Sequence, residues 1–72
     1  MTTEEELEKL ISQKVTIRRS TNDIIIEFTG VLSTAVLREY VVVADESYYM
    51  FNANVVHKVD LRFNEIVINS DH

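Results

Sequence analysis

The chain contains no cysteine, no proline and no tryptophan, and only one glycine and two histidines among its 72 residues. Without cysteine it has no disulfide framework and no thiolate metal site. A single glycine excludes a glycine-rich loop for binding phosphate. No stretch approaches the roughly 20 apolar residues of a membrane span, and no basic segment precedes an apolar run at the N-terminus. We therefore expect a cytoplasmic protein with no membrane contact.

The acidic charge is concentrated at one end of the chain. The net charge is −5, and four of the twelve acidic residues lie within the first eight positions. From Lys14 onward there are six basic and eight acidic residues, a net of −2. This distribution argues against a general polyanion binder, but it leaves room for a small site on a nearly neutral body.

The short length predicts one domain over residues 1–72 that assembles with copies of itself. A chain of this size buries only about 60 % of its unfolded surface, so a lone monomer would be marginally stable. No disulfide supplements the core. Oligomerisation is the usual remedy for a small scaffold of this kind.

Residues from about 3 to 13 are predicted to form an amphipathic helix that closes one open end of a sheet. Thr3 followed three residues later by Glu6 matches a capping box, and acidic residues suit the positive end of a helix dipole. An apolar stripe follows at helical spacing, formed by Leu7, Leu10 and Ile11. A helix that binds a partner is the alternative interpretation.

Period-two alternation then predicts a barrel over about residues 14–68. The expected strands cover 14–20, 24 to about 32, 38–45, 48–52 and 56–61. Residues 62–65 either form a turn before a further strand at 66–68 or belong to one continuous last strand. Residues 69–72 are expected to be a polar tail.

The second of these strands is expected to be bent. One parity places the apolar residues on one face, together with the only glycine: Ile24, Ile26, Phe28, Gly30 and Leu32. A glycine inside a strand weakens it unless the strand bends or another backbone comes close. A second apolar run begins at Tyr40, so we expect the bent strand to turn directly into its neighbour, as small barrels require.

Catalytic chemistry has little support in the sequence. His72 is terminal, and His57 differs in strand parity from Asp60, so the two side chains should not converge on a metal ion. Nucleophilic catalysis needs an oriented base beside a serine or threonine, and nothing local orients His57. We therefore predict no enzyme activity, no catalytic or metal-binding residues and no cofactor.

Two groups of side chains have alternative interpretations. Lys14 and Arg18 share a strand face, where they either contact phosphates or, alternatively, form a solvated outer face or pair with Glu27 across the hairpin. The aromatic residues either stack on nucleic-acid bases or form subunit contacts, where tyrosine is enriched. These residues are Tyr40, Tyr48, Tyr49 and Phe51. We favour the solvated face and the subunit contacts.

The order of elements resembles the Sm and Sm-like family over roughly Leu7 to Ile68. The segment Phe28-Thr29-Gly30-Val31-Leu32 matches the opening of that family's first motif. Val36 and Tyr40 stand where the family has an aspartate and an asparagine. The basic pair of the second motif is absent, although Asn54-Val55-Val56 is similar to the residues that follow it. The structural half of each motif is thus present, and the nucleotide-binding half is largely missing.

The resemblance implies an N-terminal helix followed by a strongly bent, five-stranded Sm-like or SH3-like barrel, mainly β in class. Copies would join edge to edge, strand four to strand five, into a closed homo-oligomeric ring. Asn52 and Asn54 flank the turn where the family reads its nucleotide, with Tyr40 opposite as a stacking surface. We therefore predict a non-catalytic, ring-forming scaffold or interaction module. The alternative is a single-stranded RNA binder that uses these three residues.

Overall fold

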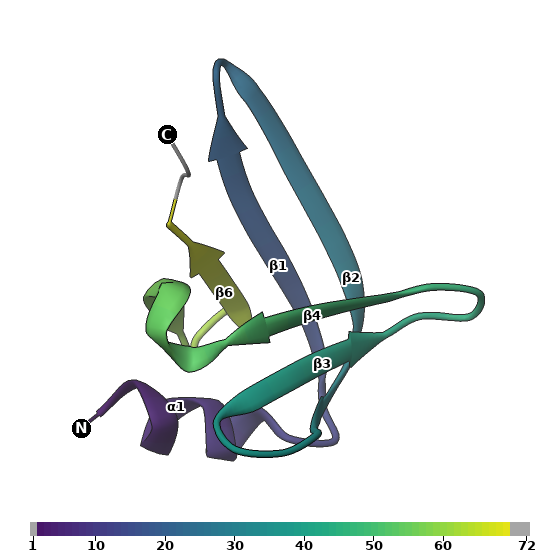
Figure 1. Ribbon diagram of the computed structural model, residues 1–72, viewed down its shortest axis with the longest axis vertical. Coiled ribbons are helices and arrows are strands. Elements are labelled where there is room, and N and C mark those ends of the chain that lie inside the picture. Colours follow the sequence, from purple (N-terminus) through teal and green to yellow (C-terminus); the bar gives the residue numbers. More distant parts are fainter. Residues whose placement is uncertain (1, 70–72) are drawn as a thin grey trace.

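The computed structural model describes residues 2–69, which form one α-helix, one 3-10 helix and six strands (Figure 1). The elements in chain order are α1 (Thr3–Leu10), β1 (Lys14–Thr21), β2 (Ile24–Thr34), β3 (Glu39–Val43), β4 (Tyr48–Asn52), η1 (Ala53–Val55), β5 (Val56–Asp60) and β6 (Glu65–Ile68). The expectation of a mainly β fold with an N-terminal helix is confirmed. Residues 70–72 of the expected polar tail lie outside the described residues.

All six strands belong to one strongly curled sheet, in the order β4-β3-β2-β1-β6-β5. Neighbouring strands are antiparallel except β1 and β6, which run parallel. The β1–β2 hairpin and the β3–β4 hairpin cross, and β4 passes over the long hairpin (Figure 1). The result is a half-barrel whose edge strands are β4 and β5.

The prediction of five strands is wrong, because the C-terminal segment is divided into β5 and β6. The two strands are joined by the turn at residues 61–64. Asn64 has a φ of 51° in this turn, a left-handed conformation that asparagine tolerates better than most residues. The alternative with a break near residues 62–65 is therefore the one that the structure shows.

The N-terminal helix begins at residue 3 as expected, but it is shorter than expected and its N-cap lies one residue earlier. Thr2, and not Thr3, is the N-cap, and it forms a capping box with Glu5. The last helical residue is Leu10, and Ser12 has a φ of 72°, which ends the helix well before residue 13. Leu7 and Leu10 are buried in the core, so the helix packs its apolar stripe against the sheet. No helix within residues 2–69 is long and apolar enough to cross a membrane.

Gly30 lies where β2 passes from its pairing with β1 alone to its pairing with β3. A Cβ at Gly30 would collide with the carbonyl oxygen of Val43, and it would lie 2.7 Å from the carbonyl carbon. The φ of Gly30 is not positive, so the glycine is needed for close backbone approach and not for a left-handed turn. The predicted role of Gly30 in a bent strand is consistent with this contact.

The core occupies the inner face of the curl beside α1. The buried apolar residues are Leu7, Leu10, Val15, Ile17, Leu32, Tyr40, Val42, Phe51, Ala53, Ile66 and Ile68. The expected apolar face of β2 reaches this core only from Phe28 onward. Ile24 and Ile26 are 63 % and 45 % exposed, because the β1–β2 hairpin extends beyond the strands that cover it (Figure 1).

Candidate functional site

Tyr40, which the sequence suggested as a stacking surface for a base, lies in the core. Its side chain is only 4 % exposed, and its ring stacks on Phe51 with centroids 5.8 Å apart. Burial and the nearby carboxylates of Glu4 and Glu8 raise the pKa of Tyr40, in that order of importance. The ring is therefore a structural element of the core, and it presents no open face to a nucleotide.

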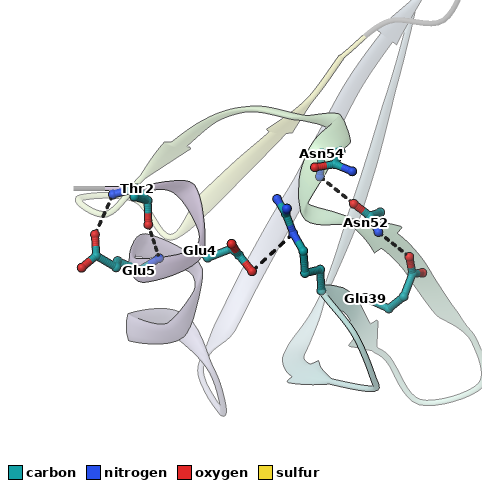
Figure 2. Close-up of polar contacts among 7 residues, drawn as sticks. Thr2, Glu4, Glu5, Glu39, Asn52 and Asn54 are labelled. Carbon is teal, nitrogen blue, oxygen red and sulfur yellow. Dashed lines mark hydrogen bonds and ion pairs between the residues drawn. The ribbon is translucent and has the colours of Figure 1, made fainter.

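Asn52 and Asn54 lie together at the end of β4, as the sequence predicted. The Oδ1 atom of Asn52 accepts a hydrogen bond of 2.8 Å from the backbone amide of Asn54, which caps η1. The Nδ2 atom of Asn52 donates a 2.7 Å hydrogen bond to Glu39 (Figure 2). Both polar atoms of the Asn52 amide are thus already used in the fold. The nucleotide-binding role of the two asparagines stays a prediction.

Arg18 of β1 lies between two acidic residues. Arg18 forms ion pairs with Glu27 across the hairpin and, at 3.0 Å, with Glu65 of β6. The register places Arg18 directly opposite Glu27. The predicted pairing of Arg18 with Glu27 is confirmed, and it leaves the guanidinium balanced by two carboxylates.

The sequence also raised His57, Asp60 and His72 as candidates for a metal or catalytic site. Within residues 2–69 no three histidine, aspartate or glutamate side chains are placed to share a metal ion. His57 is exposed on β5, and His72 lies outside the described residues. Hydrogen bonds from Arg62 lower the pKa of Asp60: the Arg62 backbone amide donates to Oδ1 at 3.0 Å, and Nη2 lies 3.4 Å from Oδ2.

Through the Sm-like resemblance the sequence placed the edge of strand four at a subunit contact, but it did not reveal that the edge of β4 is open and unprotected. Backbone hydrogen bonds join Ala44 to Ser47 at one end of the β3–β4 ladder and Ala53 to Arg38 at the other. Hydrogen-bonded and non-hydrogen-bonded pairs alternate along an antiparallel ladder. Because the pairs at Ser47 and Ala53 are hydrogen-bonded, every second residue between them, Tyr49 and Phe51, also bonds to β3. The amides and carbonyls at Tyr48, Met50 and Asn52 therefore point away from the sheet.

The side chains of β4 carry no charge, and those exposed at Tyr48 and Met50 present mostly apolar surface. β4 has the sequence YYMFN, with Tyr48 67 % exposed and Met50 52 % exposed on its outer face. The register continues this surface across the sheet, because Tyr48 pairs with Val43 and Val43 pairs with Val31. Val43 and Val31 are 47 % and 46 % exposed. We call these four residues, Tyr48, Met50, Val43 and Val31, the outer apolar surface.

The other edge of the sheet is protected in three ways that β4 is not. The pairing of β5 with β6 shifts register between Val56 and Lys58, which marks a bulge at His57. Lys58 places a charge on the strand, and α1 lies close to β5. Bulges, lysines and covering helices are the devices by which proteins prevent pairing at an edge. β4 pairs with β3 without a register shift and carries no charge.

A hollow of about 280 Å³ lies beside the open edge, between β4 and the ends of β1 and β6. Its lining includes Arg19, Tyr49, Met50, Phe51 and Ile68. The β1–β2 hairpin projects beyond β4 (Figure 1). The half-barrel is thus incomplete beside β4, where a further strand would continue the curl.

No protein-family model matches this chain, and no curated protein or solved structure matches it significantly.

Proposed function

We propose that this protein is a non-catalytic interaction module that assembles with copies of itself through the edges of its curled sheet. The observation that carries the proposal is the edge of β4, with backbone groups pointing outward beside the exposed side chains of Tyr48 and Met50. Such an edge, uncharged and without a register shift, is a template for pairing with another strand. Proteins that do not use an edge in this way normally protect it, as β5 is protected.

The size of the protein supports the same conclusion. Within residues 2–69 eleven apolar residues form the buried core, and the sequence has no cysteine to stabilise it. Pairing of sheet edges would enlarge the sheet and cover apolar surface that the isolated chain exposes. The ring implied by the Sm-like resemblance, with β4 of one copy beside β5 of the next, is one arrangement of such an assembly.

The test is a pair of substitutions at Met50, followed by light scattering coupled to size exclusion. Met50→Pro removes an amide that points outward, so it should block edge pairing without removing a bond to β3. Met50→Ala shortens the same side chain but keeps the amide. We expect wild type and Met50→Ala to have masses above the 8.3 kDa of one chain, and Met50→Pro to be monomeric.

Two results would contradict the proposal. One is a wild-type mass of 8.3 kDa at all micromolar concentrations. The other is a Met50→Pro variant that remains as large as Met50→Ala. If circular dichroism shows that Met50→Pro is unfolded, Met50→Lys replaces it, because a lysine on an edge strand opposes pairing while the amide is kept.

A further inference from the structure

The two edges of the sheet are unequal, and this inequality restricts how copies can join. A head-to-tail ring must pair β4 of one copy with β5 of the next. The bulge at His57 and the charge of Lys58 lie on β5, and α1 lies close to that strand. β4 has none of these obstacles. The most favourable partner for β4 is therefore another β4.

We propose that two copies pair through β4 in antiparallel orientation, about a two-fold axis that passes beside Met50. The inference rests on the proposed function and specifies the surface and symmetry of self-assembly. Because Tyr48, Met50 and Asn52 direct their backbone groups outward, they become the hydrogen-bonded residues of the new ladder. Met50 then lies opposite Met50 of the second copy, and Tyr48 lies opposite Asn52 of the second copy.

The side chains of β4 suit this register on both faces. On the inner face Tyr49 lies opposite Phe51 of the second copy. Cross-strand aromatic pairs of this kind stabilise sheets, and within one copy these two rings already lie 6.4 Å apart. On the outer face the two copies of the outer apolar surface become continuous. An interface made of the same patch on both copies is the property of a closed two-fold dimer.

Charge favours the antiparallel orientation. The turn between β3 and β4 carries Asp45 and Glu46. This turn and η1 lie on opposite sides of Met50, the centre of β4, at similar distances along the chain. Antiparallel pairing places this acidic turn beside the uncharged η1 of the second copy. Parallel pairing would bring the two acidic turns together in a protein whose net charge is already −5, at a cost in repulsion.

The added strand would also explain an exposed isoleucine of the long hairpin. The hollow beside the open edge of β4 is lined partly by Arg19 of β1 and Ile68 of β6, and the β1–β2 hairpin projects beyond β4 (Figure 1). A strand placed next to β4 continues the curl. Phe28 of the hairpin already contacts Tyr49 of β4, so a strand about 4.8 Å farther along would approach Ile26, which is 45 % exposed in the single copy.

The test uses the absence of cysteine, which makes any introduced thiol unique. Met50→Cys and, as a control, Lys58→Cys are each labelled with a nitroxide, and electron paramagnetic resonance spectra are recorded. In the two-fold dimer the Cα atoms at position 50 of the two copies are about 5.5 Å apart. We expect strong dipolar broadening for the label at position 50, lost on dilution with excess unlabelled protein, and none for the label at position 58. The mass should be 16.6 kDa, twice the 8.3 kDa of one chain.

The outcomes separate this inference from the function on which it rests. An oligomer with no broadening at position 50, in which a mixture of the two labelled variants does broaden, would overturn the two-fold dimer in favour of β4–β5 pairing. Self-assembly would then still hold. A labelled Met50→Cys variant and a wild type that both remain at 8.3 kDa would overturn both proposals, leaving the edge to an extended segment of a different protein.

Discussion

At the scale of single residues, Gly30 determines how closely β2 approaches β3. An added Cβ would meet backbone atoms of Val43, which cannot rotate away as the end of a flexible side chain can. We predict that Gly30→Val lowers the free energy of unfolding by more than the usual point-mutant average of about 1 kcal/mol. The measurement is urea denaturation, with Thr34→Val, an exposed position of the same strand, as control.

Valine prefers strands more than glycine does. At a site without this backbone contact, Gly30→Val would therefore raise the free energy of unfolding. Unchanged or increased stability of Gly30→Val would show that the approach to Val43 does not limit the bend. Thr34→Val should leave the stability within about 0.5 kcal/mol of wild type, as most surface substitutions do.

At the scale of elements, the start of α1 distinguishes two neighbouring threonines. Thr2 accepts a 3.2 Å hydrogen bond from the amide of Glu5, and the Glu5 carboxylate accepts a 2.8 Å hydrogen bond from the amide of Thr2 (Figure 2). We predict that Thr2→Ala destabilises the protein by about 1 kcal/mol, whereas Thr3→Ala has a smaller effect. Thermal unfolding of both variants decides between them, and equal losses would contradict the assignment of the cap.

The capping box also predicts a pH dependence. The backbone hydrogen bond from Thr2, and then that residue's side chain, lower the pKa of Glu5 from its ordinary 4.5. A lowered pKa means that the folded state favours the carboxylate. The stabilisation is therefore complete above pH 4.5 and is lost as the pH falls through the lowered value. Comparing wild type with Glu5→Gln, we expect their difference in stability to shrink below pH 4.5.

Local patterns predicted most elements but not how the strands are arranged. Alternation located β1, β2 and β4, and the turn composition at Asn22 and Asp23 agrees with their positive φ values. The C-terminal segment is divided into β5 and β6 by a turn that contains the left-handed Asn64. Alternation of apolar and polar residues does not reveal such a turn. The unequal protection of the β4 and β5 edges could not be predicted because it depends on long-range strand order. Burial of Tyr40 has the same cause.

At the scale of the whole molecule, the distribution of charge opposes the RNA-binding alternative. Arg18 is balanced by Glu27 and Glu65, and the net charge is −5. We predict that fluorescence anisotropy with short U-rich and A-rich RNA shows no affinity tighter than the nonspecific range of about 10⁻⁴ to 10⁻⁶ M. Submicromolar, base-selective binding that is weakened by Asn54→Ala and retained in Arg18→Ala would contradict this prediction.

Self-assembly through β4 is tested most directly by amide hydrogen exchange, measured residue by residue at increasing protein concentration. The amides of Tyr48 and Met50 point out of the single sheet, whereas that of Tyr49 points toward β3. We predict that protection of Tyr48 and Met50 rises with concentration while protection of Tyr49 changes much less. Fast exchange of the Met50 amide at every concentration, beside a protected Tyr49, would show that the edge stays open and would contradict the proposed assembly.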